Sequence, residues 1–298
     1  MESLRLLIDM PSLAVQLALD GLLIGGIFAL AALGMALVWG VTGIINIAQG
    51  ELVMLGGYAT FLLYEAGIHP LYGVPAAAVV MFGVGWALHV AVMSRIVEKD
   101  LFISILATFG LSILLQQLAN AFFGANVRTA QANLKTVVLP GGITVYIVKV
   151  VAFAAALLTG AALLVFLKRT RMGRAIRATA QNARAARVMG IDTRRVYGWT
   201  FALNAAICGA CGALVAMTWI VHPYLGLPYT LRSFMIVIIG GLGNVPGVIA
   251  AAAGLGIAEN FAGFLFGAEY QAGFVFTLLV AILISRRFWL GRQRRYLA

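Results

Sequence analysis

The residues best suited to chemistry lie in one early apolar stretch, residues 43–58, which reads GIINIAQGELVMLGGY. It places Asn46, Gln49 and Glu51 among glycines and apolar side chains. If this stretch crosses a membrane, the acid is costly to bury and is a functional candidate by default. The alternative is structural, because such groups also hydrogen-bond to backbone that a helix break leaves unpaired. Substrate contact and support of a break both remain open.

A second glycine-rich break lies late in the chain, at residues 240–247 (GGLGNVPG). It is not a nucleotide-binding P-loop, because the Lys and the Ser or Thr that must follow the glycines are missing. Two helix breaks, one early and one late, are the usual sequence pointer to a transporter's binding site. Close helix packing through small residues explains the same glycines equally well. The candidates for lining a substrate path are Asn46, Gln49, Glu51, Gly240, Gly241, Gly243 and Asn244.

The third feature is the polar stretch 168–197, which carries nine of the 21 Lys and Arg residues and a single acid, Asp192. Its Ala- and Arg-rich part, residues 172–189, predicts one helix that stops at Gly190. At 100° per residue, basic side chains share one broad face and small or apolar side chains share the other. The first face holds Arg174, Arg177, Arg184 and Arg187, and the second holds Ala175, Ala178, Ala185 and Met189. Such a helix either lies on anionic lipid or meets acidic groups of a partner.

The remaining reactive side chains form no catalytic or metal-binding pattern in the sequence. His69, His89 and His222 are scattered, and no nucleophile–base pair is visible. Cys208 and Cys211 lie in an apolar run rich in Gly and Ala, with no His or further Cys nearby, so we interpret them as packing residues. We expect no cofactor, no bound metal and no enzymatic activity.

Composition explains which elements must position these residues. The chain has 298 residues, of which 62% are hydrophobic and only 10% charged, too few charges for the surface of a soluble domain. Several continuous apolar runs reach about 20 residues, the length of a membrane-spanning helix, and their continuity excludes a β-barrel. We therefore predict an all-α polytopic membrane protein. The net charge of +11 sits mainly in loops, which is typical of cytoplasmic loops rather than of nucleic-acid binding.

The apolar runs predict about eight membrane segments. They fall at roughly 13–39, 44–64, 73–93, 102–122, 145–167, 198–221, 231–264 and 270–285. The polar residues 124–144 predict an extramembrane loop with a short hairpin.

Charge decides the sidedness of these segments. Lys and Arg accumulate in cytoplasmic loops, so the stretch 168–197 and the Arg-rich tail after residue 285 should face the same side. An even number of crossings must then separate them, and the segment 231–264 cannot cross only once. It either enters and returns as two arms that meet near residues 240–247, or crosses twice. Because each arm is short for a full span, we expect a broken or re-entrant helix pair there, with Glu259 near the membrane interface. The loop 124–144 falls on the opposite, outer side. The tail carries Arg286, Arg287, Arg292, Arg294 and Arg295.

Four motifs together resemble a known family. They are GVTGIINIAQGELVMLGGY at 40–58, LATFGLSILLQ at 106–116, the Arg/Ala stretch with its continuation at 173–203, and GGLGNVPGVIAAA at 240–252. Over nearly its whole length the chain resembles the membrane permeases of branched-chain amino acid ABC importers, the LivH type more than the LivM type. It departs from the usual pattern at Gln49, where a His is common, and at Asn182, where an Asp is frequent.

The resemblance implies that residues 1–298 form a single permease domain in a bacterial inner membrane. It implies that the loop after the fifth span couples the spans to a cytoplasmic ATPase. The coupling candidates are Gly173, Arg174, Arg177, Asn182, Arg184, Arg187, Gly190 and Asp192.

The same resemblance names the partners. They are a second, LivM-like permease subunit, two ATP-binding cassette subunits that hydrolyse ATP, and a periplasmic substrate-binding protein, besides lipid and with no nucleic acid. Branched-chain or related amino acids are the expected cargo, although relatives of this architecture also handle urea, short amides and aromatic acids. An ion-coupled secondary transporter using Glu51, or a structural membrane subunit, are the rival functions.

Overall fold

The computed structural model describes residues 6, 9–132, 136–139, 143–271, 273–278, 280–282 and 284–285. Helices dominate this part of the chain, and among its residues six helices are long and apolar enough to cross a membrane. The prediction of an all-α polytopic membrane protein is thus confirmed. The Arg-rich tail and the hairpin turn at 140–142 lie outside the described residues.

Two helices form the centre of the bundle, α2 (Pro11–Thr42) and α10 (Thr193–Thr218). Their most apolar stretches are 78% and 89% buried inside the protein. Small residues in α10 allow neighbouring backbones to approach closely, as in many membrane helices. A Cβ atom at Gly209 would lie 2.6 Å from the carbonyl oxygen of Ala77. Both cysteines of α10 are buried and unbonded to each other, in keeping with their interpretation as packing residues.

The outer helices present apolar side chains to their surroundings. Between 22% and 33% of their most apolar stretches is buried inside the bundle. The exposed side chains include Val79, Phe102, Leu106, Phe122 and Leu158. Apolar faces of this extent contact lipid or another subunit in a membrane protein. The outer helices are α4 (Pro70–Leu88), which continues through a π-helical turn (His89–Met93) into α5 (Ser94–Ile96), then α6 (Leu101–Phe123), α7 (Ile147–Arg169) and α12 (Val245–Phe266).

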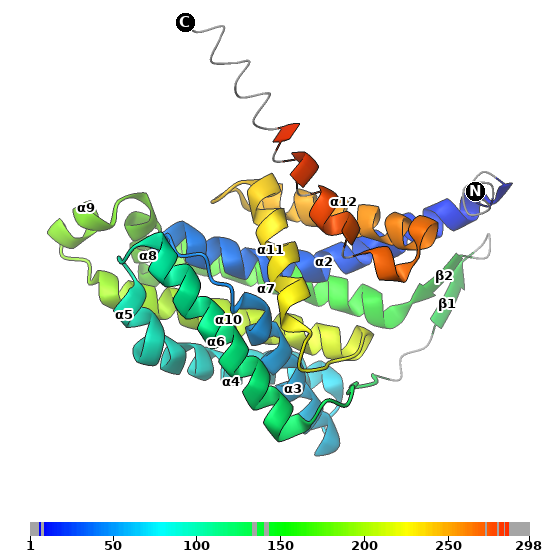
Figure 1. Cartoon of the computed structure of the whole chain (residues 1–298), viewed down its shortest axis with the longest axis horizontal. Coiled ribbons are helices and arrows are strands. Elements are labelled where there is room, and N and C mark those ends of the chain that lie inside the picture. Colours follow the sequence, from blue (N-terminus) through cyan, green and yellow to red (C-terminus); the bar gives the residue numbers. More distant parts are fainter. Residues whose placement is uncertain are drawn as a thin grey trace, which may run out of the picture.

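Two helices are too short to cross the bilayer alone. They are α3 (Gln49–Glu65, 17 residues) and α11 (Gly226–Gly240, 15 residues). At 1.5 Å per residue each spans less than the ~30 Å hydrocarbon core. The non-helical segments 43–48 and 219–225 precede them, and their first residues are buried. In Figure 1, α11 stands across the direction of α2 and α7.

The late apolar segment is a helix pair with a sharp reversal. Helix α11 ends at Gly240 and α12 begins at Val245, so the break falls where the glycine-rich motif predicts it. Gly241 and Gly243 have φ angles of 85° and 78°, a left-handed conformation that glycine adopts without steric cost. Because α12 has 22 residues, only the α11 arm of the pair is short.

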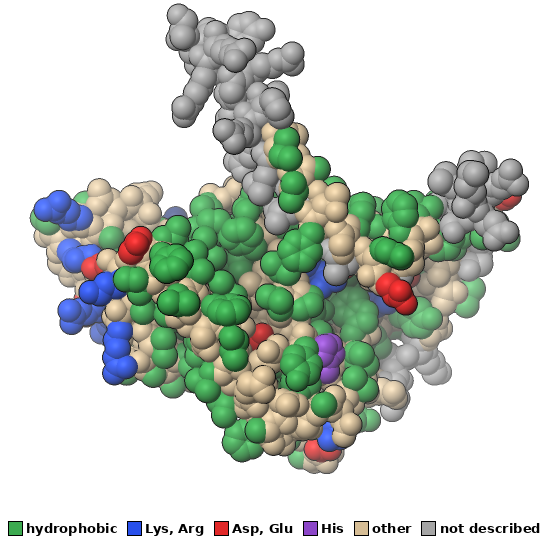
Figure 2. Space-filling view, in the orientation of Figure 1, with side chains coloured by type: hydrophobic (Ala, Val, Ile, Leu, Met, Phe, Trp, Pro, Cys, Tyr) green, Lys and Arg blue, Asp and Glu red, His purple; other side chains and the backbone are tan. Residues whose placement is uncertain are grey.

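The two ends of the bundle differ in chemistry. Helices α8 (Arg171–Gln181) and α9 (Ala183–Val188) form one end, where Lys and Arg side chains gather (Figures 1 and 2). We call this the basic end. The ends of α2 and α7 and the α11–α12 junction also lie there, because all three border one cavity beside α8.

The opposite end carries the predicted hairpin, and we call it the hairpin end. Strand β1 (Thr136–Leu139) pairs antiparallel with β2 (Ile143–Tyr146), with Thr136 opposite Tyr146 and Leu139 opposite Ile143. The start of α2 lies at the same end of the molecule (Figure 1).

Candidate functional site

The break before α3 is held in place by two threonine hydroxyls from other helices. The hydroxyl of Thr108 in α6 accepts a hydrogen bond from the Ile47 amide at 3.3 Å. The hydroxyl of Thr230 in α11 donates to the Ile47 carbonyl at 2.9 Å and accepts from the Gly50 amide at 2.8 Å. Irregular backbone inside a membrane protein is tolerated only where such groups satisfy it or where it lines a cavity. The non-helical segment is therefore a specifically stabilised part of the bundle interior.

Gln49 ties three helices together at the centre of the bundle. Its side-chain amide donates to the Asn204 Oδ1 atom at 2.9 Å and accepts from the Asn204 Nδ2 atom at 3.0 Å. It also donates to the Ala31 carbonyl at 3.1 Å and contacts the Cys208 sulfur at 3.1 Å. Gln49 is fully buried. In this conformation its polar atoms are engaged by protein rather than by a solute.

Glu51 has a different environment. It is fully buried, and its Oε1 atom accepts a hydrogen bond from the Ser112 hydroxyl at 3.1 Å. The first residue of α11 packs directly on it, since a Cβ atom at Gly226 would lie 2.3 Å from the carboxyl group. Within the described part of the chain, its Oε2 atom has no hydrogen-bond partner.

Asn46 and Ser233 extend this group of unsatisfied polar atoms. Both residues are buried, and neither amide atom of Asn46 nor the Ser233 hydroxyl has a partner among the described residues. Buried polar groups are normally hydrogen-bonded, and leaving one unpaired costs about 1–3 kcal/mol. Asn46, Glu51 and Ser233 thus each carry buried polar atoms that could bind a solute or water.

The late glycines do not join this group. Glu51 lies at the first residue of α11, whereas Gly240 is the last, a separation of about 21 Å at 1.5 Å per residue. Gly243 and Asn244 border a cavity beside Lys168 at the basic end. The Asn244 side chain caps α12 by accepting from the Gly247 amide at 3.2 Å. The early candidates thus remain close in sequence at the break but face different neighbours, and Gly240, Gly241, Gly243 and Asn244 lie elsewhere.

The Arg/Ala stretch is two helices, so the prediction of one helix over 172–189 is wrong. The chain is extended at Asn182 (φ −159°, ψ 101°), and the side chain of this residue caps α9 by accepting from the Ala185 amide at 2.9 Å. Asn competes for backbone in this way and favours helix starts over helix interiors. Because the chain changes direction at Asn182, α9 leaves Ala185 and Met189 exposed instead of packing them on the bundle.

Four of the proposed coupling residues shape this loop. A Cβ atom at Gly173 would lie 2.4 Å from the Phe166 carbonyl oxygen, so only glycine lets α8 fold back so closely on α7. Gly190, with a φ angle of 82°, ends α9 as predicted. Asp192 starts α10, because its carboxylate accepts from the Arg194 and Arg195 amides at 3.0 and 3.2 Å. Asn182 is the fourth.

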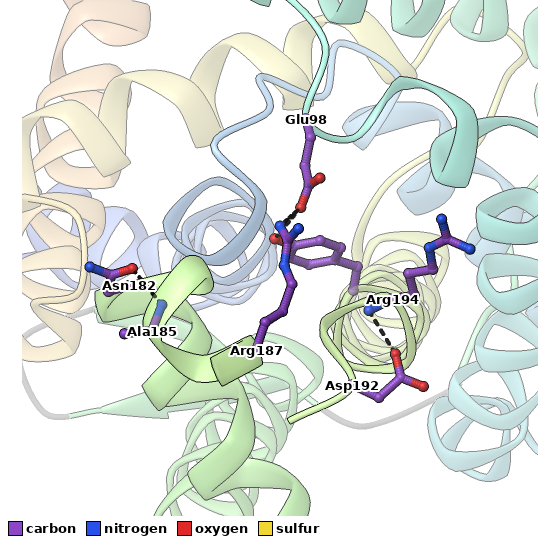
Figure 3. Close-up of polar contacts among 7 residues, drawn as sticks. Glu98, Asn182, Ala185, Arg187, Asp192 and Arg194 are labelled. Carbon is purple, nitrogen blue, oxygen red and sulfur yellow. Dashed lines mark hydrogen bonds and ion pairs between the residues drawn. The ribbon is translucent and has the colours of Figure 1, made fainter. Parts of the chain in front are cut away.

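The arginines of the loop differ in their contacts. Arg174, Arg177 and Arg184 are exposed. Arg187 reaches from α9 to form an ion pair with Glu98, in the turn between α5 and α6 (Figure 3). The Tyr197 hydroxyl of α10 donates to the same carboxylate at 3.3 Å.

Two apolar residues form the tip of this loop. Val188 and Met189 are 83% and 81% exposed, next to the anchored Arg187. An exposed apolar tip flanked by cations is suited to a groove on another protein.

Sequence reasoning missed the polar partners contributed by distant helices. They are Glu98, Thr108, Ser112, Asn204, Thr230 and Arg232. The available signal was a lone polar residue within a predicted span, which is costly unless it has a partner. Glu259 is likewise buried against Arg232, a partner that the sequence did not suggest.

Comparison with known proteins agrees with this architecture. Residues 17–283 match the model of the family described as branched-chain amino acid transport system / permease component. The chain belongs to this family of permeases.

Curated relatives match across almost the whole chain. The LivH permease protein of Escherichia coli strain K12 is 29% identical, with 91% of this chain and 92% of that protein aligned. The BraD permease protein of Pseudomonas aeruginosa is 26% identical over 91% of this chain and 94% of its own length. A LivH protein of Methanocaldococcus jannaschii is 26% identical, with 92% and 90% covered. No solved structure matches the chain.

Proposed function

We propose that this permease is the transmembrane subunit of an ATP-driven importer for branched-chain or related amino acids. Its partners would be a second permease subunit, two ATP-binding cassette subunits and a periplasmic substrate-binding protein. Residues 1–298 act as one permease domain in a bacterial inner membrane, with the basic end in the cytoplasm and the loop 124–144 outside. Curated relatives named for high-affinity branched-chain amino acid transport support the cargo.

The observation that carries the proposal is the α8–α9 unit. A subunit driven from outside needs a rigid contact that receives force and passes it to the membrane helices. Val188 and Met189 supply an exposed apolar tip, while the Arg187–Glu98 ion pair and the Gly173 contact fix the unit to the bundle. The exposed Arg174, Arg177 and Arg184 would meet acidic groups around an ATPase groove.

Transport would proceed by alternating access around the break before α3. Glu51 lies where α3, α6 and α11 meet, and its unsatisfied oxygen, like the unsatisfied atoms of Asn46 and Ser233, suits transient hydrogen bonds to a solute. Because Gln49 is locked to Asn204, we assign it to holding the break in shape.

Co-isolation with the ATPase tests the proposal. The tagged wild-type permease, expressed with its cognate subunits, should retain the ATP-binding cassette protein. We expect deletion of residues 172–192, reversal of Arg184 and Arg187 to Glu, or Val188→Asp to abolish that retention. Val127→Asp is the matched control, since Val127 is 58% exposed on a loop remote from α9. Equal retention by Val188→Asp, the reversed-charge variant and wild type would refute the coupling role.

The carboxylate of Glu51 also favours one competing mechanism, that of an ion-coupled secondary transporter. A buried acid with an unpaired oxygen is a plausible proton or cation site. Reconstituted vesicles decide between the two mechanisms. An importer stops when the ATPase Walker motif is inactivated, whereas uptake that follows an imposed ion gradient without ATP would overturn the proposal.

A further inference from the structure

A second polar site lies within the bundle, apart from the break before α3. A partly open cavity of about 380 Å³ is bordered by α2, α11, α12 and the segment 219–225. Its volume falls within the range of about 300–1,000 Å³ that is usual for small-molecule sites. The start of α7 contributes Lys149 to its wall. Because Lys149 directly follows the hairpin, this cavity lies toward the hairpin end.

The cavity contains an ion pair that apolar packing does not require. Arg232 of α11 donates through Nε to the two oxygens of Glu259 at 3.1 and 3.0 Å, and its Nη2 atom contacts the same carboxylate. The two side chains are only 17% and 7% exposed. A buried pair of this kind is weak evidence for stability, since apolar residues of the same volume often serve as well. Stability alone is therefore a weak reason for this pair, and its two charged groups are candidates for binding a ligand.

Aromatic side chains complete the cavity wall. The Arg232 guanidinium lies 5.1 Å from the ring centroid of Phe28 and 5.6 Å from that of Tyr229. Phe28 also stacks on Trp219, with ring centroids 6.4 Å apart. The wall thus offers a cation, an anion and a broad apolar surface within one small volume.

We propose that this cavity binds a free α-amino acid with an apolar side chain, as a zwitterion. Glu259 engages the Nε–Nη2 edge of Arg232, so the Nη1 edge can hold a carboxylate, and Glu259 can accept from an ammonium group. The aromatic rings would hold the apolar side chain. Lys149, which lines the cavity, is paired with Asp20 at 3.0 Å, so this second charged pair is also neutral overall. A site with balanced charges favours a zwitterion over a simple anion or cation.

The proposal rests on the importer function, for which it supplies a receiving site on the outer side. Binding can nevertheless be measured on the permease alone. Full-length protein in lipid nanodiscs is titrated with tritiated L-leucine, and two analogues compete: 4-methylpentanoic acid, which lacks the amine, and 3-methylbutylamine, which lacks the carboxylate. We expect each analogue to bind at least about tenfold more weakly than leucine, because each forfeits one charged hydrogen bond.

Two variants locate the site. Glu259→Gln should weaken leucine binding at least about tenfold and abolish the preference for leucine over 4-methylpentanoic acid, since the ammonium loses its acceptor. Trp219→Ala lies outside any helix, preserves both ion pairs and should weaken leucine binding about fivefold through lost apolar contact. Glu65→Gln, an exposed carboxylate of α3, is the matched control and should bind like wild type.

The outcomes separate the inference from the importer proposal. Unchanged leucine binding by Trp219→Ala, or by a folded Glu259→Gln protein, would overturn the cavity as the binding site. Wild-type protein that shows no preference for leucine over either analogue would do the same. None of these results depends on the ATPase, whereas failed co-isolation with the ATPase would refute the importer proposal and leave the cavity result standing.

Discussion

Exchange of the buried amide pair Gln49–Asn204 for apolar residues tests whether Gln49 is structural. The pair makes two reciprocal hydrogen bonds between α3 and α10 at 2.9 and 3.0 Å. Asn204→Leu leaves the Gln49 Oε1 atom without its hydrogen-bond donor. Gln49→Met leaves the Asn204 side-chain amide without its partner. The double variant removes both side-chain amides, so neither leaves an unpaired polar atom. We expect each single change to destabilise the protein and the double change to cost less than the sum.

The size of the effect follows from the number of lost partners. Interhelical hydrogen bonds in membrane proteins average about 0.6 kcal/mol, so two of them set a lower bound of about 1.2 kcal/mol. A stranded buried polar group adds a desolvation cost of about 1–3 kcal/mol. Each single variant should therefore lose about 2–4 kcal/mol. The coupling free energy of the cycle should reach about 1 kcal/mol or more.

Unfolding in mixed detergent and SDS micelles, followed by helical circular dichroism, gives the four free energies of unfolding. Single-variant effects that add to within about 0.5 kcal/mol would refute the amide-pair reasoning. Uptake by the reconstituted double variant gives an independent readout. Retained uptake supports a structural role for Gln49, whereas complete loss of uptake with normal folding would place Gln49 in the substrate path.

Further predictions follow from single contacts. Gly50→Ala should prevent normal packing of α3 on α11, because the new Cβ would lie 1.7 Å from the Gly226 carbonyl oxygen; a cost of about 1–3 kcal/mol should appear in the same unfolding assay. Gly83→Ala is the control, because its new Cβ meets no atom within 4 Å; it should be neutral or raise the free energy of unfolding by up to about 1 kcal/mol. Equal destabilisation by Gly50→Ala and Gly83→Ala would contradict the close contact between Gly50 and Gly226. Glu98→Gln breaks a half-exposed ion pair, so its stability should change by less than about 1 kcal/mol while ATP-driven uptake falls; wild-type uptake would refute transmission through Arg187. Glu51→Ala should abolish uptake while the complex still assembles, as size-exclusion chromatography can show; loss of assembly would support the structural reading.

Local sequence signals predicted the helices well. Continuous apolar runs located α2, α6 and α7 to within about three residues, because hydrocarbon thickness sets a common length for membrane helices. The glycine-rich motif marked the reversal between α11 and α12, where two residues adopt positive φ angles that favour glycine. The strand-forming residues of TVVL and ITVY on either side of a Pro-Gly-Gly turn predicted the hairpin. Each of these features is set by residues close together in the chain.

The candidate site was less predictable because its partners are far apart in sequence. The break at Asn46–Glu51 was visible, but Gln49 and Asn204 are 155 residues apart, and no local pattern pairs them. The paired-break rule joined the early and late glycines, yet the length of α11 separates them. Alanine-rich flanks also hid the helix start at Asn182, because summed propensity outweighed a single capping residue.

The division of the basic loop at Asn182 has a mechanical consequence. Helix α8 is seated on α7 through Gly173, whereas α9 is tethered through Arg187 and Glu98 to the turn after α5 and to α10. Helix α7 packs on α2, and α10 packs extensively on α4 and α3. If an ATPase pushes on Val188, as proposed, the push would reach α7 through α8 and α10 through Arg187, on the two sides of the extended residue Asn182. Under the proposed coupling role, the loop would transmit one push to helices on both sides of the break before α3.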